Sequence, residues 1–281
     1  MKKVGIIVGS LRKEAYSKKV AQNLALMLPN EIISEFIEIG TLPLFNEDLE
    51  DQGVLEWTAF KAKITDADAL LFVTPEYNRS IPGVLKNAID VGSRPAGDNS
   101  WNGKPAMIIS NSPGSIGGFG ASQHLKQVAL AVGMTIIQLA EVYLSRANAL
   151  FAKNGLLNND SLGRFLNQVI TSLVQHILSA PATDKRSSQS QLVSYRPTPT
   201  QLIVLNSQQQ TVGNGIFSIN NRILTITEVT VDPDFRGLGI AAEIVVKLIL
   251  LAQIFNLKID PVCPYAKTFF EKHSGAQKIL I

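Results

Sequence analysis

Short apolar runs alternate with longer amphipathic segments along roughly the first 180 residues. The runs lie near residues 4, 32, 69, 106 and 135, and those at residues 4–8 and 69–73 are apolar at nearly every position. Strands that are apolar throughout are typical of a parallel sheet with helices on both faces. The pattern therefore predicts a doubly wound α/β domain around a five-stranded parallel sheet.

Polar residues with interspersed prolines interrupt this periodicity at residues 181–201 and predict a linker. Three strand patterns follow it, at residues 202–205, 215–219 and 223–231. The apolar segment 242–255 then predicts a helix. We therefore expect one domain at residues 1–180 and a small α+β domain at residues 202–281, and the length of the chain agrees with two domains.

Three loops of the first domain carry its candidate binding chemistry, and each follows an apolar run. They are residues 9–17, 75–83 and 112–120. In the flavodoxin-like strand order 2-1-3-4-5, strands one, three and four are neighbours, and ligands lie outside their carboxyl ends. We therefore expect the three loops to meet in one crevice.

The first loop has the residue types that bind a phosphate. Ser10, Arg12 and Ser17 supply hydroxyls and a forked cation just before a predicted helix, whose N-terminus attracts anions. The alternative is a solvated loop in which Ser17 merely caps the helix. The sequence lacks Gly-x-Gly-x-x-Gly after this strand and Gly-x-x-x-x-Gly-Lys-Ser/Thr anywhere, which argues against a Rossmann dinucleotide site and a P-loop kinase.

The other two loops suit a flat ring. Pro75 and Pro82 stiffen the second loop, so Tyr77 and the neighbouring amides can flank a ring and its polar edge. The third loop has four glycines within residues 114–120, and its backbone can approach a ligand closely. The alternative for both loops is a tight turn without a ligand. Glu76 is expected to be solvated rather than to transfer protons.

Three motifs in these loops resemble the NADPH-dependent FMN reductase family over residues 1–178. They are Gly-Ser-Leu-Arg-Lys from residue 9, Pro-Glu-Tyr-Asn-x-Ser-x-Pro-Gly-x-Leu-Lys-Asn-Ala-Ile-Asp from residue 75, and Ser-Pro-Gly-x-x-Gly-Gly from residue 112. The resemblance implies a flavodoxin-like fold, bound FMN and reduction by NAD(P)H. It also implies small-molecule electron acceptors, namely flavins, quinones, azo dyes or metal oxyanions, and a homodimer or homotetramer.

The resemblance assigns three groups of residues to FMN. The phosphate group is Ser10, Arg12 and Ser17; the flavin-edge group is Pro75, Glu76, Tyr77, Asn78 and Ser80; the second flavin wall is Ser112, Gly114 and Gly117. Hydride passes directly between stacked nicotinamide and flavin rings. For this reason no catalytic acid or base is assigned in this domain.

The second domain contains another candidate anion site, a glycine turn between a strand and a helix. The turn holds Arg236, Gly237, Gly239 and Ala241. It resembles the acetyl-CoA signature of the GNAT acyltransferase superfamily, in particular its short members, and Val229 and Val231 on the preceding strand are assigned to the same cofactor. Amides of such a turn suit a pyrophosphate. The alternative is a plain strand-turn-helix connection.

Three residues are candidates for acyl transfer. Glu228 could deprotonate an amine, and Tyr265 could reprotonate the leaving thiolate. Cys263 is the only cysteine, so an intramolecular disulfide is excluded; it is interpreted as a small buried hydrophobe, with a catalytic thiol as the alternative. The three histidines are scattered, and we expect no metal site.

Charge and hydropathy narrow the function further. Residues 1–180 carry 16 basic and 16 acidic side chains, whereas residues 181–281 carry 10 and 7, so the net charge of +3 belongs to the second part (10 − 7 = 3). The sequence has no concentrated basic face for nucleic acid, no apolar run near twenty residues and no pattern of a signal peptide. We therefore expect a cytoplasmic protein without nucleic-acid or membrane partners.

The favoured interpretation is an NAD(P)H-dependent flavin or quinone reductase with a fused GNAT-like domain. One alternative is a flavodoxin-like FMN carrier that exchanges electrons with a protein partner. Another is a GNAT acyltransferase whose flavin domain senses the redox state.

Overall fold

The computed structural model describes residues 1–137, 140–179 and 193–281. These residues form two compact units, and each unit takes segments from more than one part of the chain. The first unit contains residues 1–21, 31–150 and the C-terminal part of helix α5 (Asp160–Ser179). The second unit contains residues 22–30, 151–171 and the chain from residue 193 onward.

The first unit is built on a parallel sheet in the order β2-β1-β3-β4-β5, which confirms the predicted flavodoxin-like order. Its strands are β1 (Lys2–Val8), β2 (Ile32–Phe36), β3 (Ala69–Pro75), β4 (Pro105–Asn111), β5 (Thr135–Ile136) and β6 (Val142–Leu144). The last predicted strand is short: β5 pairs with the start of β4, and β6 pairs with its end. The central strand β3 is buried along almost its whole length, as its apolar sequence predicts.

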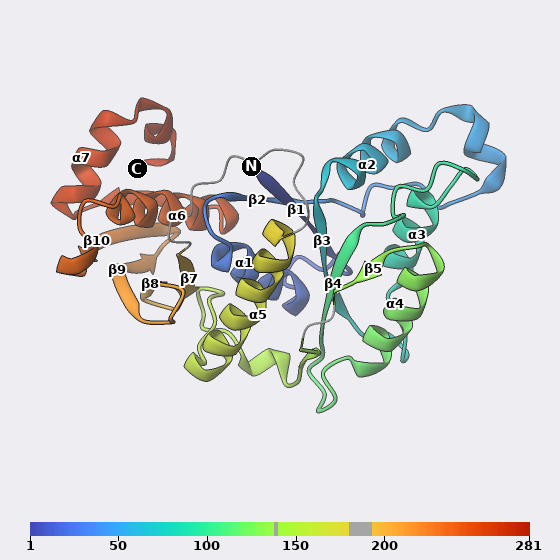
Figure 1. Cartoon of the computed structure of the whole chain (residues 1–281), viewed down its shortest axis with the longest axis horizontal. Coiled ribbons are helices and arrows are strands. Elements are labelled where there is room, and N and C mark those ends of the chain that lie inside the picture. Colours follow the sequence, from blue (N-terminus) through green and yellow to red (C-terminus); the bar gives the residue numbers. More distant parts are fainter. Residues whose placement is uncertain (138–139, 180–192) are drawn as a thin grey trace. The chain divides into compact units, whose positions relative to one another are not determined.

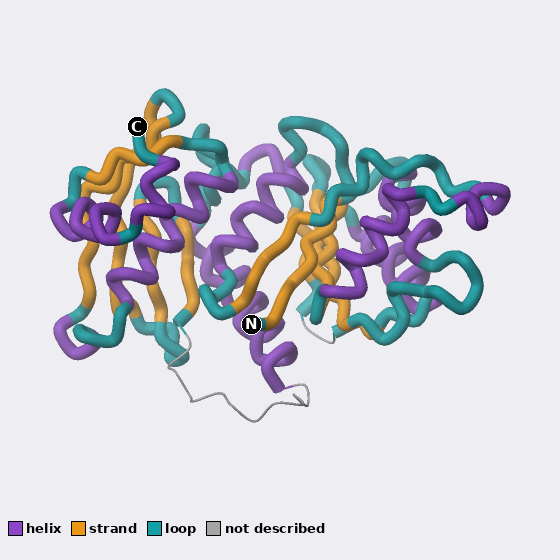
Figure 2. The backbone as a smooth tube through the Cα atoms, turned by 90° about the horizontal axis from the view of Figure 1, so that it is seen from above, coloured by secondary structure: helices purple, strands orange, loops and turns teal. Residues whose placement is uncertain are grey.

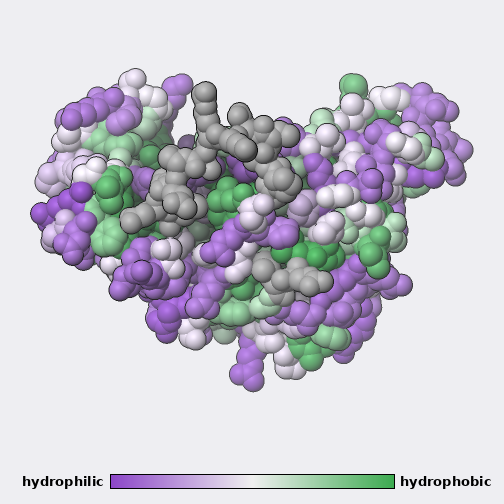
Figure 3. Space-filling model, in the orientation of Figure 1, coloured by the Kyte–Doolittle hydropathy of each residue, from purple (hydrophilic) through white to green (hydrophobic). Residues whose placement is uncertain are grey.

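Helices cover both faces of this sheet. They are α1 (Tyr16–Met27), α2 (Leu55–Asp66), α3 (Gly83–Gly92), α4 (Phe119–Ala131), the end of α5, and the 3-10 turns η1 (Glu47–Gln52) and η2 (Ala147–Ala149). Helices α2, α3 and α4 lie on one face, and the parts of α1 and α5 that belong to this unit lie on the other (Figures 1 and 2). Phe72 and Trp101 are fully buried in the core on the α3 side. Turn η1 has no buried residue, and its surface is hydrophilic in Figure 3.

The second unit contains a five-stranded sheet in the order β11-β10-β9-β8-β7. Its elements are β7 (Ser194–Pro197), β8 (Gln201–Leu205), β9 (Thr211–Asn220), β10 (Ile223–Val231), η3 (Pro233–Phe235), α6 (Ile240–Ile254), β11 (Lys258–Pro261), α7 (Pro264–Lys272) and η4 (Ser274–Ile279). All neighbouring pairs are antiparallel except β10 and β11. The predicted small α+β architecture is confirmed.

Part of the predicted linker 181–201 is a strand. Strand β7 pairs with β8, and its Tyr195 is fully buried opposite Val204. The prolines that suggested a linker are compatible with this position because β7 is an edge strand, where a missing N–H costs little. Residues 181–192 lie outside the described residues.

Helix α6 is apolar on nearly all sides, yet it buries one charge in the core of the second unit. Lys247 is 2% exposed; its Nζ donates to the carbonyl oxygen of Leu28 at 2.8 Å and lies 4.8 Å from the centre of the Tyr195 ring. The Tyr195 hydroxyl donates to Glu243 Oε2 at 2.9 Å. Burial of this lysine is therefore supported by defined polar contacts.

In the part of the chain that the structure covers, no helix combines the length and apolar character of a membrane span.

Candidate functional site

The three predicted loops extend from the carboxyl ends of β1, β3 and β4, which are neighbours in the sheet. The first strand end is joined closely to the second: Gly9 N donates to the Val73 carbonyl at 2.9 Å. A Cβ atom at Gly9 would lie 2.8 Å from Thr74 Oγ1, so the glycine allows the two strand ends to approach. The topology thus brings the loops to one edge of the sheet.

The first loop presents several backbone N–H groups that have no acceptor. In residues 10–18, only Arg12 N and Ala15 N donate to an acceptor among the described residues, and Arg12 N does so to Ser10 Oγ at 3.4 Å. Exposed Arg12 adds a cation to this group. A run of free N–H groups before a helix is a suitable cradle for a phosphate.

Ser17 does not cap the helix as the alternative interpretation required. Helix α1 begins at Tyr16, so Ser17 lies inside its first turn. The residue is 1% exposed, and its Oγ makes no hydrogen bond with any described residue. A buried hydroxyl without a partner is costly, and a phosphate oxygen at this turn would satisfy it. These residues therefore fit the phosphate of FMN.

The second loop is a tight hairpin. Tyr77 and Ser80 exchange two backbone hydrogen bonds of 3.0 Å, and the two residues between them, Asn78 and Arg79, have φ angles of 51° and 66°. Left-handed backbone at two successive residues is the geometry of a narrow β-turn. The hairpin leaves Tyr77 exposed at its base, where the ring can lie beside a flat ligand.

Side chains of this hairpin are bound to helix α4, which follows the third loop. Glu76 Oε2 accepts a hydrogen bond from Ala121 N at 3.1 Å, and Ser80 Oγ lies 2.6 Å from His124 Nδ1. The Glu76 side chain is only 10% exposed, so the expectation of a solvated carboxylate is wrong. The free N–H groups at the start of α4 attract this carboxylate. Sequence reasoning missed both contacts because each joins residues more than forty positions apart.

The third loop is pinned to the segment after β6. Ser112 N donates to the Leu144 carbonyl at 3.0 Å, and Ser145 Oγ donates to the Ser115 carbonyl at 2.6 Å. Gly117 has a φ of 61°, and a Cβ there would lie 2.5 Å from the carbonyl carbon of Tyr143. This glycine is therefore required by packing against the chain itself. Gly114 differs, because it is exposed and its N–H donates to Ser112 Oγ at 3.1 Å.

Four large apolar side chains around these loops are exposed. They are Leu11, Tyr77, Ile116 and Phe119. Phe119 packs edge to face on Tyr143, with 5.3 Å between the ring centres. Burial of the Tyr143 phenol and its hydrogen bond with Glu141 raise the pKa of that phenol, so it stays protonated. The loops thus offer apolar surface for rings beside a polar cradle for a phosphate.

The predicted glycine turn of the second unit connects β10 to α6. Gly237 and Gly239 have φ angles of 80° and 83°, which L side chains rarely adopt, and Cβ atoms there would meet nothing within 4 Å. Within the described residues, no backbone N–H of residues 237–241 has an acceptor. Exposed Arg236 precedes the glycines. The turn is therefore an open cradle of N–H groups at the start of a fifteen-residue helix.

Strand β10 extends beyond its parallel neighbour. Its last residue paired with β11 is Ile226, whereas the strand continues to Val231, and the pairing with β9 shifts between Ile226 and Glu228. Val229 and Val231 pair with β9 alone. The edge of β10 that faces away from β9 is therefore available at these residues to an extended ligand, since a strand edge can bind peptide-like groups through its backbone.

The three candidates for acyl transfer lie near this strand but form no hydrogen-bonded group. Cys263 is 5% exposed, and its N–H donates to the Ile226 carbonyl at 2.9 Å. Burial agrees with the interpretation of Cys263 as a small core residue. Glu228 and Tyr265 are exposed, and no hydrogen bond joins the three side chains. Across the ranges described, no cluster of three or more His, Cys, Asp or Glu side chains could hold a metal ion.

Comparisons with known proteins separate the chain into two parts. The model of the family described as NADPH-dependent FMN reductase matches residues 2–149, and that of the GCN5-related N-acetyl-transferase matches residues 202–279. A quinone reductase of Pseudomonas putida is 51% identical over 157 residues, covering 56% of this chain and 84% of the relative. A 2-hydroxy-1,4-benzoquinone reductase of a Burkholderia species is 40% identical, covering 58% and 90%.

Among solved structures, one that is similar to the first part of the chain gives a direct comparison of folds. It is the flavoenzyme NAD(P)H:(acceptor) oxidoreductase FerB of Paracoccus denitrificans, which is 37% identical and superposes with a TM-score of 0.60. The similarity covers 63% of this chain and 98% of that structure. The sequence similarity and the structural similarity thus cover the same part of the chain.

Proposed function

Because the chain belongs to the NADPH-dependent FMN reductase family, we propose that its first unit binds FMN in the three loops and reduces quinone-type acceptors with NAD(P)H. The observation that supports this most is the phosphate cradle: N–H groups without an acceptor precede α1, and the buried Ser17 hydroxyl in the first turn of that helix has no hydrogen-bond partner among the described residues. A reductase needs such a site to retain a cofactor that is bound without a covalent bond.

Bound FMN would supply the redox chemistry, by taking a hydride from NAD(P)H and passing electrons to the acceptor. The protein would bind and orient the rings. Ser17 and Arg12 would hold the phosphate, and the hairpin of Tyr77 would flank the flavin edge. Exposed Ile116 and Phe119 would cover the reacting rings and exclude water.

Two relatives that reduce quinones, according to their names, support a small aromatic acceptor. Apolar side chains near the loops suit such a molecule, because burial of its ring against them is favourable. Flavins, azo dyes and metal oxyanions remain further acceptors within the proposal.

An absorption spectrum of the purified protein tests the first step. We expect flavin bands that bleach with NADPH in the absence of oxygen, and steady NADPH oxidation when 1,4-benzoquinone is added. A protein that binds no flavin would contradict the proposal. Bleaching without turnover on any small acceptor would instead favour the electron carrier that exchanges with a protein partner.

We also propose that residues 202–279 bind acetyl-CoA at the glycine turn, with Arg236, Gly237, Gly239 and Ala241 around the pyrophosphate and the free edge at Val229 and Val231 beside the pantetheine. The support is the cradle of free N–H groups before α6. Calorimetry of acetyl-CoA with the whole protein tests binding. Acetyl transfer that changes when the flavin is reduced would favour the alternative in which the flavin unit senses redox state.

The proposal places the protein in the cytoplasm as a homodimer or homotetramer. NAD(P)H and acetyl-CoA are supplied in that compartment, and the resemblance to the reductase family implies the assembly. Light scattering of the purified protein and fractionation of cells test these two points. A monomer at micromolar concentration would contradict the assembly.

A further inference from the structure

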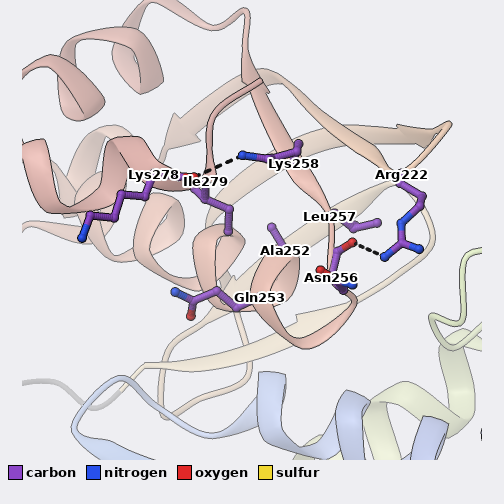
Figure 4. A pocket seen from close by; sticks show the side chains of 8 residues that line it. All are labelled: Arg222, Ala252, Gln253, Asn256, Leu257, Lys258, Lys278 and Ile279. Atoms are coloured by element: carbon purple, nitrogen blue, oxygen red, sulfur yellow. Dashed lines mark hydrogen bonds between the residues drawn. The ribbon is translucent and has the colours of Figure 1, made fainter.

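A cavity of the second unit lies at the far end of α6 from the glycine turn. Its volume is about 510 Å³. Its walls come from the β9–β10 turn, the end of α6, the start of β11 and η4 (Figure 4). The lining residues are Arg222, Ala252, Gln253, Asn256, Leu257, Lys258, Lys278 and Ile279.

The lining contains three cations and no carboxylate. Backbone carbonyls hold two of these cations in place: Arg222 Nη2 donates to the Asn256 carbonyl at 2.9 Å, and Lys258 Nζ donates to the Leu280 carbonyl at 3.0 Å. In the described parts of the chain, no carboxylate forms an ion pair with any of the three cations. Lys278 extends outward from the rim in Figure 4. Arg222 and Lys258 thus present uncompensated positive charge in fixed positions.

Arg222 occupies an unfavourable backbone conformation. It is the second residue of the two-residue turn between β9 and β10, with a φ of 62° after a φ of 49° at Asn221. Glycine is strongly preferred at this place in such a turn, and a left-handed residue with a side chain costs about 1 kcal/mol or more. The guanidinium that this strained residue carries lies at the cavity.

The remaining lining combines the amide side chains of Gln253 and Asn256 with three apolar side chains. Of the apolar ones, Ala252 is buried, and Leu257 and Ile279 are partly buried. An anion with a non-polar body would place its charge at Arg222 and Lys258 and its body on these side chains. Arginine binds phosphate oxygens through two parallel N–H groups, which favours a phosphate over a halide.

We infer that this cavity is a binding site for a small molecule that carries a phosphate or diphosphate group. The site is separate from the glycine turn, because the fifteen residues of α6 span about 22 Å between them. The inference does not depend on the proposed reductase or on acetyl-CoA binding. The inference gives a role to Arg222, whose backbone is strained, and to the other cations that line the cavity.

Inorganic pyrophosphate is the probe, titrated by calorimetry into the purified full-length protein at constant ionic strength, with sodium chloride as the reference. Arg222→Gly is the main variant. It removes the guanidinium and also relieves the left-handed strain, so the turn is retained. We expect the dissociation constant for pyrophosphate at this site to rise about tenfold to a hundredfold, the effect of losing a hydrogen bond to a charged group. Lys272→Gln, an exposed cation of α7 outside the cavity, should leave it unchanged.

The glycine turn could also bind pyrophosphate, and a second variant distinguishes the two sites. Gly239→Val should leave binding at the cavity intact, while Arg222→Gly should leave acetyl-CoA binding intact. Loss of all pyrophosphate binding in Gly239→Val would overturn the inference, as would parent protein that binds no pyrophosphate after loading with acetyl-CoA. Equal affinity of the parent and Arg222→Gly for pyrophosphate would also overturn it.

Discussion

The carboxylate of Glu76 accepts a hydrogen bond from the backbone N–H of Ala121, with 3.1 Å between Oε2 and N. This bond joins the loop after β3 to the first turn of α4. A Cβ atom at Gly120 would lie 3.0 Å from the same oxygen, so the helix N-terminus approaches the carboxylate closely. One buried side chain thus fixes two of the three loops against each other.

We expect Glu76→Ala to lower the free energy of unfolding of the first unit by about 1 to 3 kcal/mol, because it leaves the N–H of buried Ala121 without its acceptor. The change should also weaken FMN binding by disordering the second loop. Glu76→Gln keeps an acceptor oxygen and should retain most of both. Thermal unfolding and a fluorescence titration with FMN measure the two effects, and full FMN affinity in Glu76→Ala would argue against this coupling.

Ser17→Ala tests the phosphate cradle directly. Without FMN, the variant should be at least as stable as the parent, because the hydroxyl it removes is buried and has no partner among the described residues. With FMN, affinity should fall by about 1.5 to 3 kcal/mol, the value of a hydrogen bond to a charged group. A helix cap would behave differently, since its loss destabilises the protein even without cofactor. Unfolding curves of apo and FMN-loaded protein separate these cases.

Arg12→Ala should weaken FMN binding by about 1.5 to 3 kcal/mol through loss of the charged contact with the phosphate. Riboflavin has no phosphate, so its affinity for the variant and the parent should be equal. Equilibrium titrations of both flavins provide the comparison. If FMN affinity does not change, Arg12 is only a surface cation.

In the second unit, Gly239→Val should abolish acetyl-CoA binding and leave NADPH oxidation unchanged. Valine is strained at a φ of 83°, and its branched side chain would block the cradle of N–H groups. Calorimetry with acetyl-CoA and the quinone assay are run on the same full-length sample. Retained acetyl-CoA binding would show that the cofactor lies elsewhere.

Asp68 should make the stability of the first unit depend on acid pH. Burial raises the pKa of its carboxyl, but hydrogen bonds from Lys2 Nζ and Lys3 N outweigh this and lower the pKa below the ordinary value of 3.8. The stabilisation is therefore present above that value and is lost as the pH falls below it. Asp68→Asn should unfold with a weaker dependence on pH between about pH 4 and pH 2 than the parent. Identical profiles would assign the acid sensitivity to other carboxyls.

The sequence by itself determined the parallel sheet and the three loops that follow its strands, because strands such as residues 69–73 are apolar throughout and glycines and prolines mark the turns after them. The order of the strands was expected from the flavodoxin-like topology that the family resemblance implies, not from a local pattern. The same reasoning found the glycine turn before α6. Glycine marks positions where the backbone is left-handed, and the backbone is left-handed at Gly237 and Gly239.

Only the tertiary structure decided how these parts are fixed. The burial of Glu76 depends on a helix that begins more than forty residues later, and the reason for Gly117 is the backbone of Tyr143. Strand β7 could not be predicted, since an edge strand with prolines has the composition of a linker until Tyr195 is seen in a core. The burial of a side chain and the pairing of a strand depend on residues that are distant in the sequence, so they cannot be predicted from a local sequence pattern.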